Sequence, residues 1–101
     1  MKQIQIGTYT GNGSNQSVII GFAPDKIEAF NNTELAKWQS PMSSGAAILI
    51  RGATGSMLRI ESLGFAQLTT AEYPTGNGFR AGESVNQSGN SYYYEASRNA
   101  N

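Results

Sequence analysis

The sequence predicts a small all-β protein: an antiparallel β-sandwich or jelly-roll-like domain over residues 1–101, with at most one short helix. Apolar and polar residues alternate with a period of two in many short segments, whereas the 3.6-residue period of an amphipathic helix is almost absent. Breaks rich in glycine and asparagine separate these segments about every ten residues, as turns do in sandwiches and small barrels. A chain of 101 residues also has the size of one domain.

Six segments carry the strand pattern and are bounded by turn-forming residues. In the first, Ile4 and Ile6 share one face and Tyr9 takes the other. The fourth is apolar at nearly every position, which predicts a strand buried on both faces. The six predicted strands are 2–10, 17–22, 26–30, 46–52, 57–62 and 91–97.

One segment, 31–41, departs from the strand pattern. Asn32 or the residue after it could cap a helical turn, and Pro41 would end that turn. Leu35 and Trp38 are three residues apart, so a helix would direct both side chains at the sheet. A short helix and an ordered loop fit this segment equally well.

The tetrapeptide TGNG occurs twice, at 10–13 and at 75–78. Neither copy is followed by the Lys-Ser/Thr pair and the helical pattern that a phosphate-binding loop requires. Asn-Gly tolerates positive φ and is the preferred centre of a type I′ hairpin turn. We therefore expect both copies to be hairpin turns. The turn residues would be Gly11, Asn12, Gly13, Gly76, Asn77 and Gly78.

The composition argues against several classes of function. Seven basic and seven acidic residues cancel, so no net field draws the chain to nucleic acid or to an anionic membrane. There is neither histidine nor cysteine, which removes the commonest general base and the commonest transition-metal ligands. A glycosidase would need two carboxylates brought together by the fold, and no feature of the sequence selects a pair. We expect no enzyme activity, no cofactor and no metal site.

Two parts of the chain resemble a group of small structural and tail-associated proteins of tailed bacteriophages. The group's pattern opens with Gly-x-Tyr-x-Gly-Asn/Asp-Gly, continues after a strand with Gly-Phe-x-Pro-Asp, and closes with Gly-Phe, Val-Asn-x-Ser-Gly and Tyr-x-Tyr. The matching residues of the first part are Gly7, Tyr9, Gly11, Asn12, Gly13, Gly21, Phe22, Pro24 and Asp25. Those of the second part are Gly78, Phe79, Val85, Asn86, Ser88, Gly89, Tyr92 and Tyr94.

This resemblance implies a virion component without catalytic residues. A stand-alone domain with neither fibre repeats nor a coiled coil favours a capsid decoration (cement) protein, which stabilises the shell through protein–protein contacts. Such a protein is made in the host cytoplasm and lies on the capsid surface. Its expected partners are the major capsid protein and copies of itself, as a trimer or dimer. The alternative is a tail-tip or baseplate module that binds host-surface carbohydrate through exposed aromatic side chains.

Large side chains near the middle and the end of the chain are the candidate contact residues. In a strand, Tyr92 and Tyr94 point to one face and Tyr93 to the other, so we expect one face in the core and the other exposed. Trp38 and Met42 lie in a loop-like segment and are candidate interface anchors, with core burial as the competing interpretation for Trp38.

Overall fold

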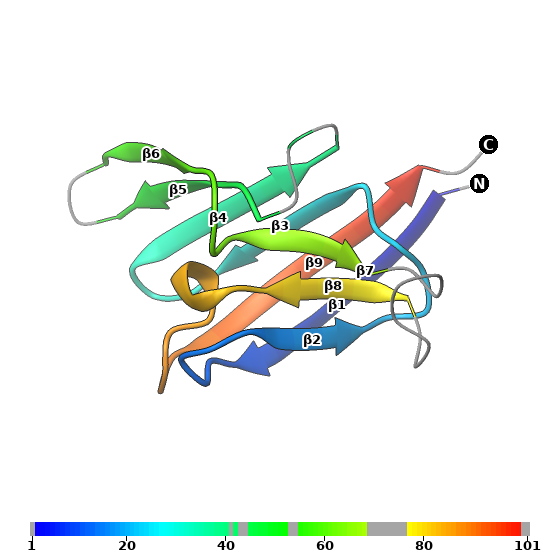
Figure 1. The fold of residues 1–101 in the computed structure, drawn as a ribbon, viewed down its shortest axis with the longest axis horizontal. Coiled ribbons are helices and arrows are strands. Elements are labelled where there is room, and N and C mark those ends of the chain that lie inside the picture. Colours follow the sequence, from blue (N-terminus) through cyan, green and yellow to red (C-terminus); the bar gives the residue numbers. More distant parts are fainter. Residues whose placement is uncertain (1, 41, 43–44, 53–54, 69–76, 100–101) are drawn as a thin grey trace.

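A computed structural model describes residues 2–40, 42, 45–52, 55–68 and 77–99 of the chain. Within these residues, a six-stranded and a three-stranded antiparallel sheet pack against each other (Figure 1). The only helical element in the described part is the 3-10 turn Glu83–Val85. The all-β, sandwich-like fold expected from the sequence is therefore confirmed.

The order of strands in space differs from their order along the chain, because the last strand lies between the first and the third. Across the six-stranded sheet the order is β1 (Lys2–Thr10), β9 (Ser91–Asn99), β3 (Lys26–Phe30), β4 (Glu34–Gln39), β5 (Ala47–Arg51) and β6 (Met57–Ile60). Across the three-stranded sheet it is β2 (Gln16–Ile19), β8 (Gly78–Ala81) and β7 (Phe65–Leu68).

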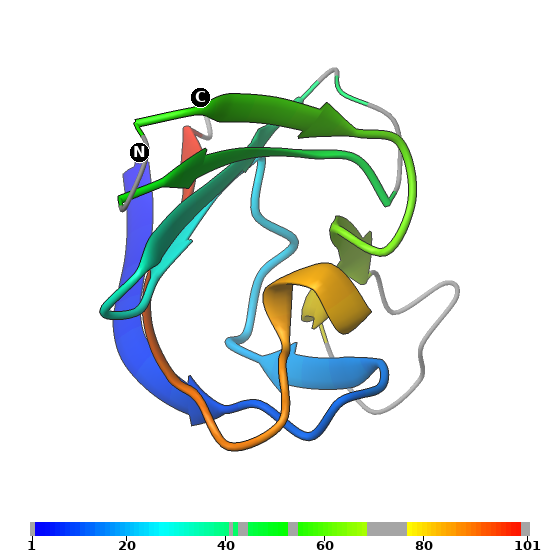
Figure 2. The same ribbon diagram turned by 90° about the vertical axis from the view of Figure 1, so that its left-hand side faces the viewer.

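The six-stranded sheet curls around the three-stranded sheet, and one core fills the space between them (Figure 2). Aromatic rings from both sheets meet in this core. Phe79 of β8 makes edge-to-face contacts with Tyr9, Tyr94 and Phe65, at centroid distances of 6.2, 5.3 and 5.8 Å. Aromatic pairs of this kind contribute about 0.5–1.5 kcal/mol beyond the burial of their area. Phe79 therefore holds the two sheets together.

The structure shows which face of each alternating strand is covered. In β1, Tyr9 is 6% exposed whereas Ile6, on the opposite face, is 71% exposed. The isoleucine face of β1 thus points away from the core. β5 differs from the expectation of burial on both faces: Leu49 is buried, whereas its neighbours Ile48 and Ile50 are only half-buried on the outer face.

β4 replaces the short helix or loop considered for this part of the sequence. Asn31 shapes the turn before it, because its Oδ1 accepts hydrogen bonds from the backbone N–H groups of Thr33 and Glu34 at 2.8 and 3.0 Å. The strand then pairs with β3 on one side and β5 on the other. Pairing on both sides outweighs the helix propensity of its residues. Leu35 and Trp38 consequently point to opposite faces, and Trp38 is buried.

The first TGNG copy is not a hairpin turn, because the strands on either side of it belong to different sheets. Only Gly13 has a positive φ (80°), whereas a type I′ turn would require one at Asn12 as well. The segment crosses between the sheets and binds the loop before β9. The N–H groups of Gly11 and Gly13 donate to the carbonyl oxygens of Asn90 and Asn86 at 2.8 and 2.9 Å.

The described part of the second copy is not a turn centre either. Gly76 lies outside the described residues. The Asn77 carbonyl accepts hydrogen bonds from two N–H groups just after β2, at 3.0 and 3.1 Å. Gly78 begins β8 and is buried, and a Cβ there would lie 2.0 Å from the carbonyl oxygen of Val18. Close approach of two backbones, rather than a turn conformation, requires this glycine.

Candidate functional site

The outer face of the six-stranded sheet carries a continuous row of apolar side chains. Five neighbouring strands each contribute one member, and each member is the direct cross-strand partner of the next. Because neighbouring strands lie about 4.8 Å apart, the row is about 19 Å long. From β9 to β6, this apolar row consists of Tyr93, Phe30, Leu35, Ile50 and Met57.

Solvent reaches the apolar row along its whole length. Met57, Tyr93 and Phe30 are 70%, 52% and 49% exposed, and Leu35 and Ile50 are half-buried. The rings of Tyr93 and Phe30 stack with their centroids 5.5 Å apart. Scattered apolar residues are normal on a protein surface, whereas a contiguous and ordered set of this kind indicates an interaction site.

A charged row runs beside the apolar row on the same face. Its acidic members, Glu95 and Glu28, lie on β9 and β3, and its basic members, Lys37 and Arg59, lie on β4 and β6. The β5 position between the two basic residues is the half-buried Ile48. Lys37 Nζ and Glu28 Oε1 are 3.7 Å apart across the β3–β4 pair. Ion pairs this exposed contribute at most about 1 kcal/mol, so these charges can orient a partner more than they stabilise the fold. An apolar centre with a polar border is the arrangement found in protein interfaces.

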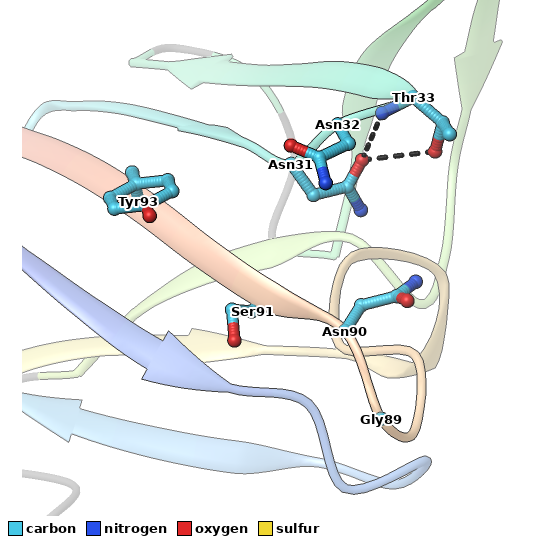
Figure 3. A pocket seen from close by; sticks show the side chains of 7 residues that line it. All are labelled: Asn31, Asn32, Thr33, Gly89, Asn90, Ser91 and Tyr93. Atoms are coloured by element: carbon cyan, nitrogen blue, oxygen red, sulfur yellow. Dashed lines mark hydrogen bonds between the residues drawn. The ribbon is translucent and has the colours of Figure 1, made fainter.

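A polar hollow of about 380 Å³ lies next to Tyr93. Figure 3 shows the side chains of Asn31, Asn32 and Asn90 around it, from the β3–β4 turn and the loop before β9, with the Tyr93 ring to one side. The Thr33 hydroxyl donates a hydrogen bond of 3.0 Å to Asn31 Oδ1 and fixes that amide. Side-chain amides and an aromatic ring together can bind the hydroxyl groups and the apolar face of a sugar.

The structure keeps only one of the predicted contact residues fully at the surface. Tyr93 is exposed and belongs both to the apolar row and to the polar hollow. Tyr92, Tyr94 and Trp38 are 1%, 6% and 4% exposed and belong to the core, and Met42 is half-buried against that core. The expected division of the tyrosine run into a core face and an exposed face is confirmed. Contact roles for Tyr92, Tyr94 and Trp38 are wrong, because their rings fill the space between the sheets.

Most of the apolar row is not found by sequence reasoning. One signal was readable: Phe30 shares a face with Lys26 and Glu28 in the alternation of the third predicted strand. The register that aligns residues of five strands cannot be read from any single strand. The members that sequence reasoning missed are Phe30, Leu35, Ile50 and Met57.

Comparison of the chain with protein-family models, with curated proteins and with solved structures finds no match. Across the described residues, His, Cys, Asp and Glu side chains do not gather in threes or more in a way that could hold a metal ion. The described chain also contains no helix with the length and apolar character needed to cross a membrane. The side chains of this face offer apolar contact, hydrogen bonding and ion pairing.

Proposed function

We propose that this protein is a non-enzymatic structural component of a bacteriophage virion, and that it acts as a capsid decoration protein. Its role would be to stabilise the shell through protein–protein contacts. The observation that carries the proposal is the exposed apolar row with its charged border, which offers a contact surface. The resemblance of two parts of the chain, one near its start and one near its end, to phage structural proteins supports the virion setting.

The apolar row suits a protein partner better than a small molecule. It follows the sheet surface for about 19 Å, which suits the centre of the roughly 800 Å² that one partner of an ordinary stable complex contributes. Tyr93 and Phe30 add rigid rings, which lose little side-chain entropy on binding and are common at interface centres. Symmetry repeats one such contact at every copy, so that a modest affinity per copy is enough to stabilise a shell.

The copy number of the chain per purified virion tests the proposal directly. Quantitative mass spectrometry against the major shell protein is expected to give hundreds of copies, as a capsid lattice requires. A handful of copies would move the protein to the tail or baseplate. Absence from the particle would overturn the virion proposal.

Two adjacent residues of β6 test whether the apolar row is the contact surface. Met57 belongs to the row, and Leu58 lies on the opposite face of the same strand, with 70% and 46% exposure. We expect Met57→Lys to weaken binding to particles that lack the protein by about tenfold or more, because it places a charge in an apolar contact. Leu58→Lys should leave binding nearly unchanged. Equal affinities of the two variants for the particle would exclude the apolar row as the contact surface.

The polar hollow favours a second function, a tail-tip or baseplate module that binds host-surface carbohydrate. Tyr93 can stack on the apolar face of a sugar ring, while Asn32 and Asn90 can bind its hydroxyl groups. A glycan array would detect this activity. Binding that is lost in Tyr93→Ala and Asn90→Ala but retained in Met57→Lys would establish the carbohydrate function, because Met57 lies at the far end of the apolar row. No binding to any glycan would exclude it.

A further inference from the structure

Strand β1 is an open sheet edge without the features that usually protect one. It pairs with β9 on one side, and no described strand pairs with its other side (Figure 1). It is nine residues long, its one charged residue is Lys2, and it contains no proline. Its register with β9 is unbroken from Lys2 to Thr10, so it contains no bulge. Short length, charges, prolines and bulges are the means by which proteins stop edge strands from pairing.

The other sheet edges of the described structure are built differently. β6, β2 and β7 are four residues long, less than half the length of β1. β6 also carries Arg59, which is exposed. β1 is therefore the one edge, among those described, that is both long and uncharged over most of its length.

We infer that two copies of this chain pair through their β1 strands, antiparallel, about a two-fold axis perpendicular to the six-stranded sheet. A strand paired antiparallel with its own copy is self-complementary, because each copy offers the other the same backbone donors and acceptors. Residues 3–10 carry no charge, so the pairing brings no like charges together. The inference rests on β1 alone and stands or falls independently of the proposed virion function.

The outer-face side chains of β1 favour two registers. With the axis at Gln5, Ile4 of each copy lies opposite Ile6 of the other; with the axis at Ile6, the two Ile6 side chains lie opposite each other. Ile4 and Ile6 are 50% and 71% exposed, so either register removes apolar surface from water. Both registers join the two six-stranded sheets into one continuous sheet.

Single cysteines can locate the axis, because the chain has none of its own. Directly opposite Cα atoms in an antiparallel pair are about 4.5–5.5 Å apart, a separation that a disulfide spans. A residue two positions from the axis lies about 14 Å from its own copy. We expect Gln5→Cys or Ile6→Cys to form a disulfide-linked dimer in air about tenfold faster than Thr8→Cys or Met57→Cys. Equal rates at all four positions would overturn the inference.

Ile6 and Met57 also form a matched pair for measuring oligomeric state. They lie on the outer face of the two edge strands of one sheet and are 71% and 70% exposed. Sedimentation equilibrium should give the dimer mass for the wild type and for Met57→Lys, and the monomer mass for Ile6→Lys, which brings like charges together. A wild type that stays monomeric up to about 1 mM would overturn the inference. A wild-type dimer that does not bind particles lacking the protein would count against the proposed function only.

Discussion

The phenol rings of Tyr9 and Tyr92 lie parallel in the core, with their centroids 5.0 Å apart and their planes inclined by 9°. Both hydroxyl groups bind the backbone of the same loop. Tyr9 donates to the Val85 carbonyl oxygen at 2.7 Å, and the Gln87 N–H donates to the Tyr92 hydroxyl at 3.1 Å. This ring pair therefore fixes the loop that leads into β9, and through it the crossover between the sheets.

Replacing Tyr9 by Phe should destabilise the protein by about 1–3 kcal/mol, because the buried Val85 carbonyl loses its hydrogen-bond donor while the ring remains. Urea unfolding followed by tyrosine fluorescence or circular dichroism would measure the change. Tyr93→Phe is the matched control, since Tyr93 is 52% exposed, and its stability should stay within about 0.5 kcal/mol of the wild type. Equal effects of the two variants would contradict this role of Tyr9.

Stability should fall at alkaline pH because of Tyr9. Burial, with a smaller contribution from Tyr92, raises the pKa of the Tyr9 phenol well above its ordinary value of 10.0. The unfolded chain releases this proton above about pH 10 while the folded chain retains it. The contribution of the Tyr9 phenol to the free energy of unfolding is thus complete below pH 10. Above pH 10 this contribution is lost, at up to ~1.4 kcal/mol per pH unit. Urea unfolding from pH 9 to 12 should show this slope, and it should be shallower in Tyr9→Phe.

Gly11→Ala should be among the most destabilising single substitutions in the chain. A Cβ at Gly11 would lie 1.9 Å from the carbonyl oxygen of Gln87, so the crossover would have to move away from the loop that it binds. We expect a loss of more than about 3 kcal/mol. Gly89→Ala is the control: no atom lies within 4 Å of its Cβ position, and only its positive φ opposes the change, at a cost of about 1 kcal/mol. Thermal melting of the two variants would compare them.

Leu63→Asn should stabilise the protein by about 1 kcal/mol. Leu63 has φ +65°, a left-handed conformation that is unfavourable for leucine and well tolerated by asparagine. Leu58 has the same 46% exposure but lies in strand β6, so Leu58→Asn should bring no gain. Urea unfolding midpoints of the two variants and the wild type, measured side by side, would test this prediction. A drop in stability for Leu63→Asn would mean that its contacts outweigh the strain.

The sequence predicted six of the nine described strands, and the three that it missed share a physical cause. β7 and β8 contain none of the β-branched residues that mark the equally short β2 and β6. β8 also begins with a glycine that is required by backbone contact rather than by a turn. β4 has residues that favour a helix, and its strand conformation comes from pairing with β3 and β5. Interactions between distant segments decided all three.

The candidate site was less predictable than the fold. Alternation shows that Ile6 and Tyr9 take opposite faces of β1, but it cannot show which face another sheet covers. In this protein the aromatic face is covered and the aliphatic face is open. For the tyrosine run, alternation predicted one buried and one exposed face, but not that Tyr93 would be the exposed residue.

The pairing of β1 with β9 also has a mechanical consequence. Lys2 is the cross-strand partner of Asn99, so the first and last strands end side by side (Figure 1). A pulling force applied through these two ends would act across the ladder and break its hydrogen bonds one pair at a time, as a zipper opens. A force applied along the strand axis would have to break all of them together. The same sheet is therefore weak in one direction of load and strong in the other.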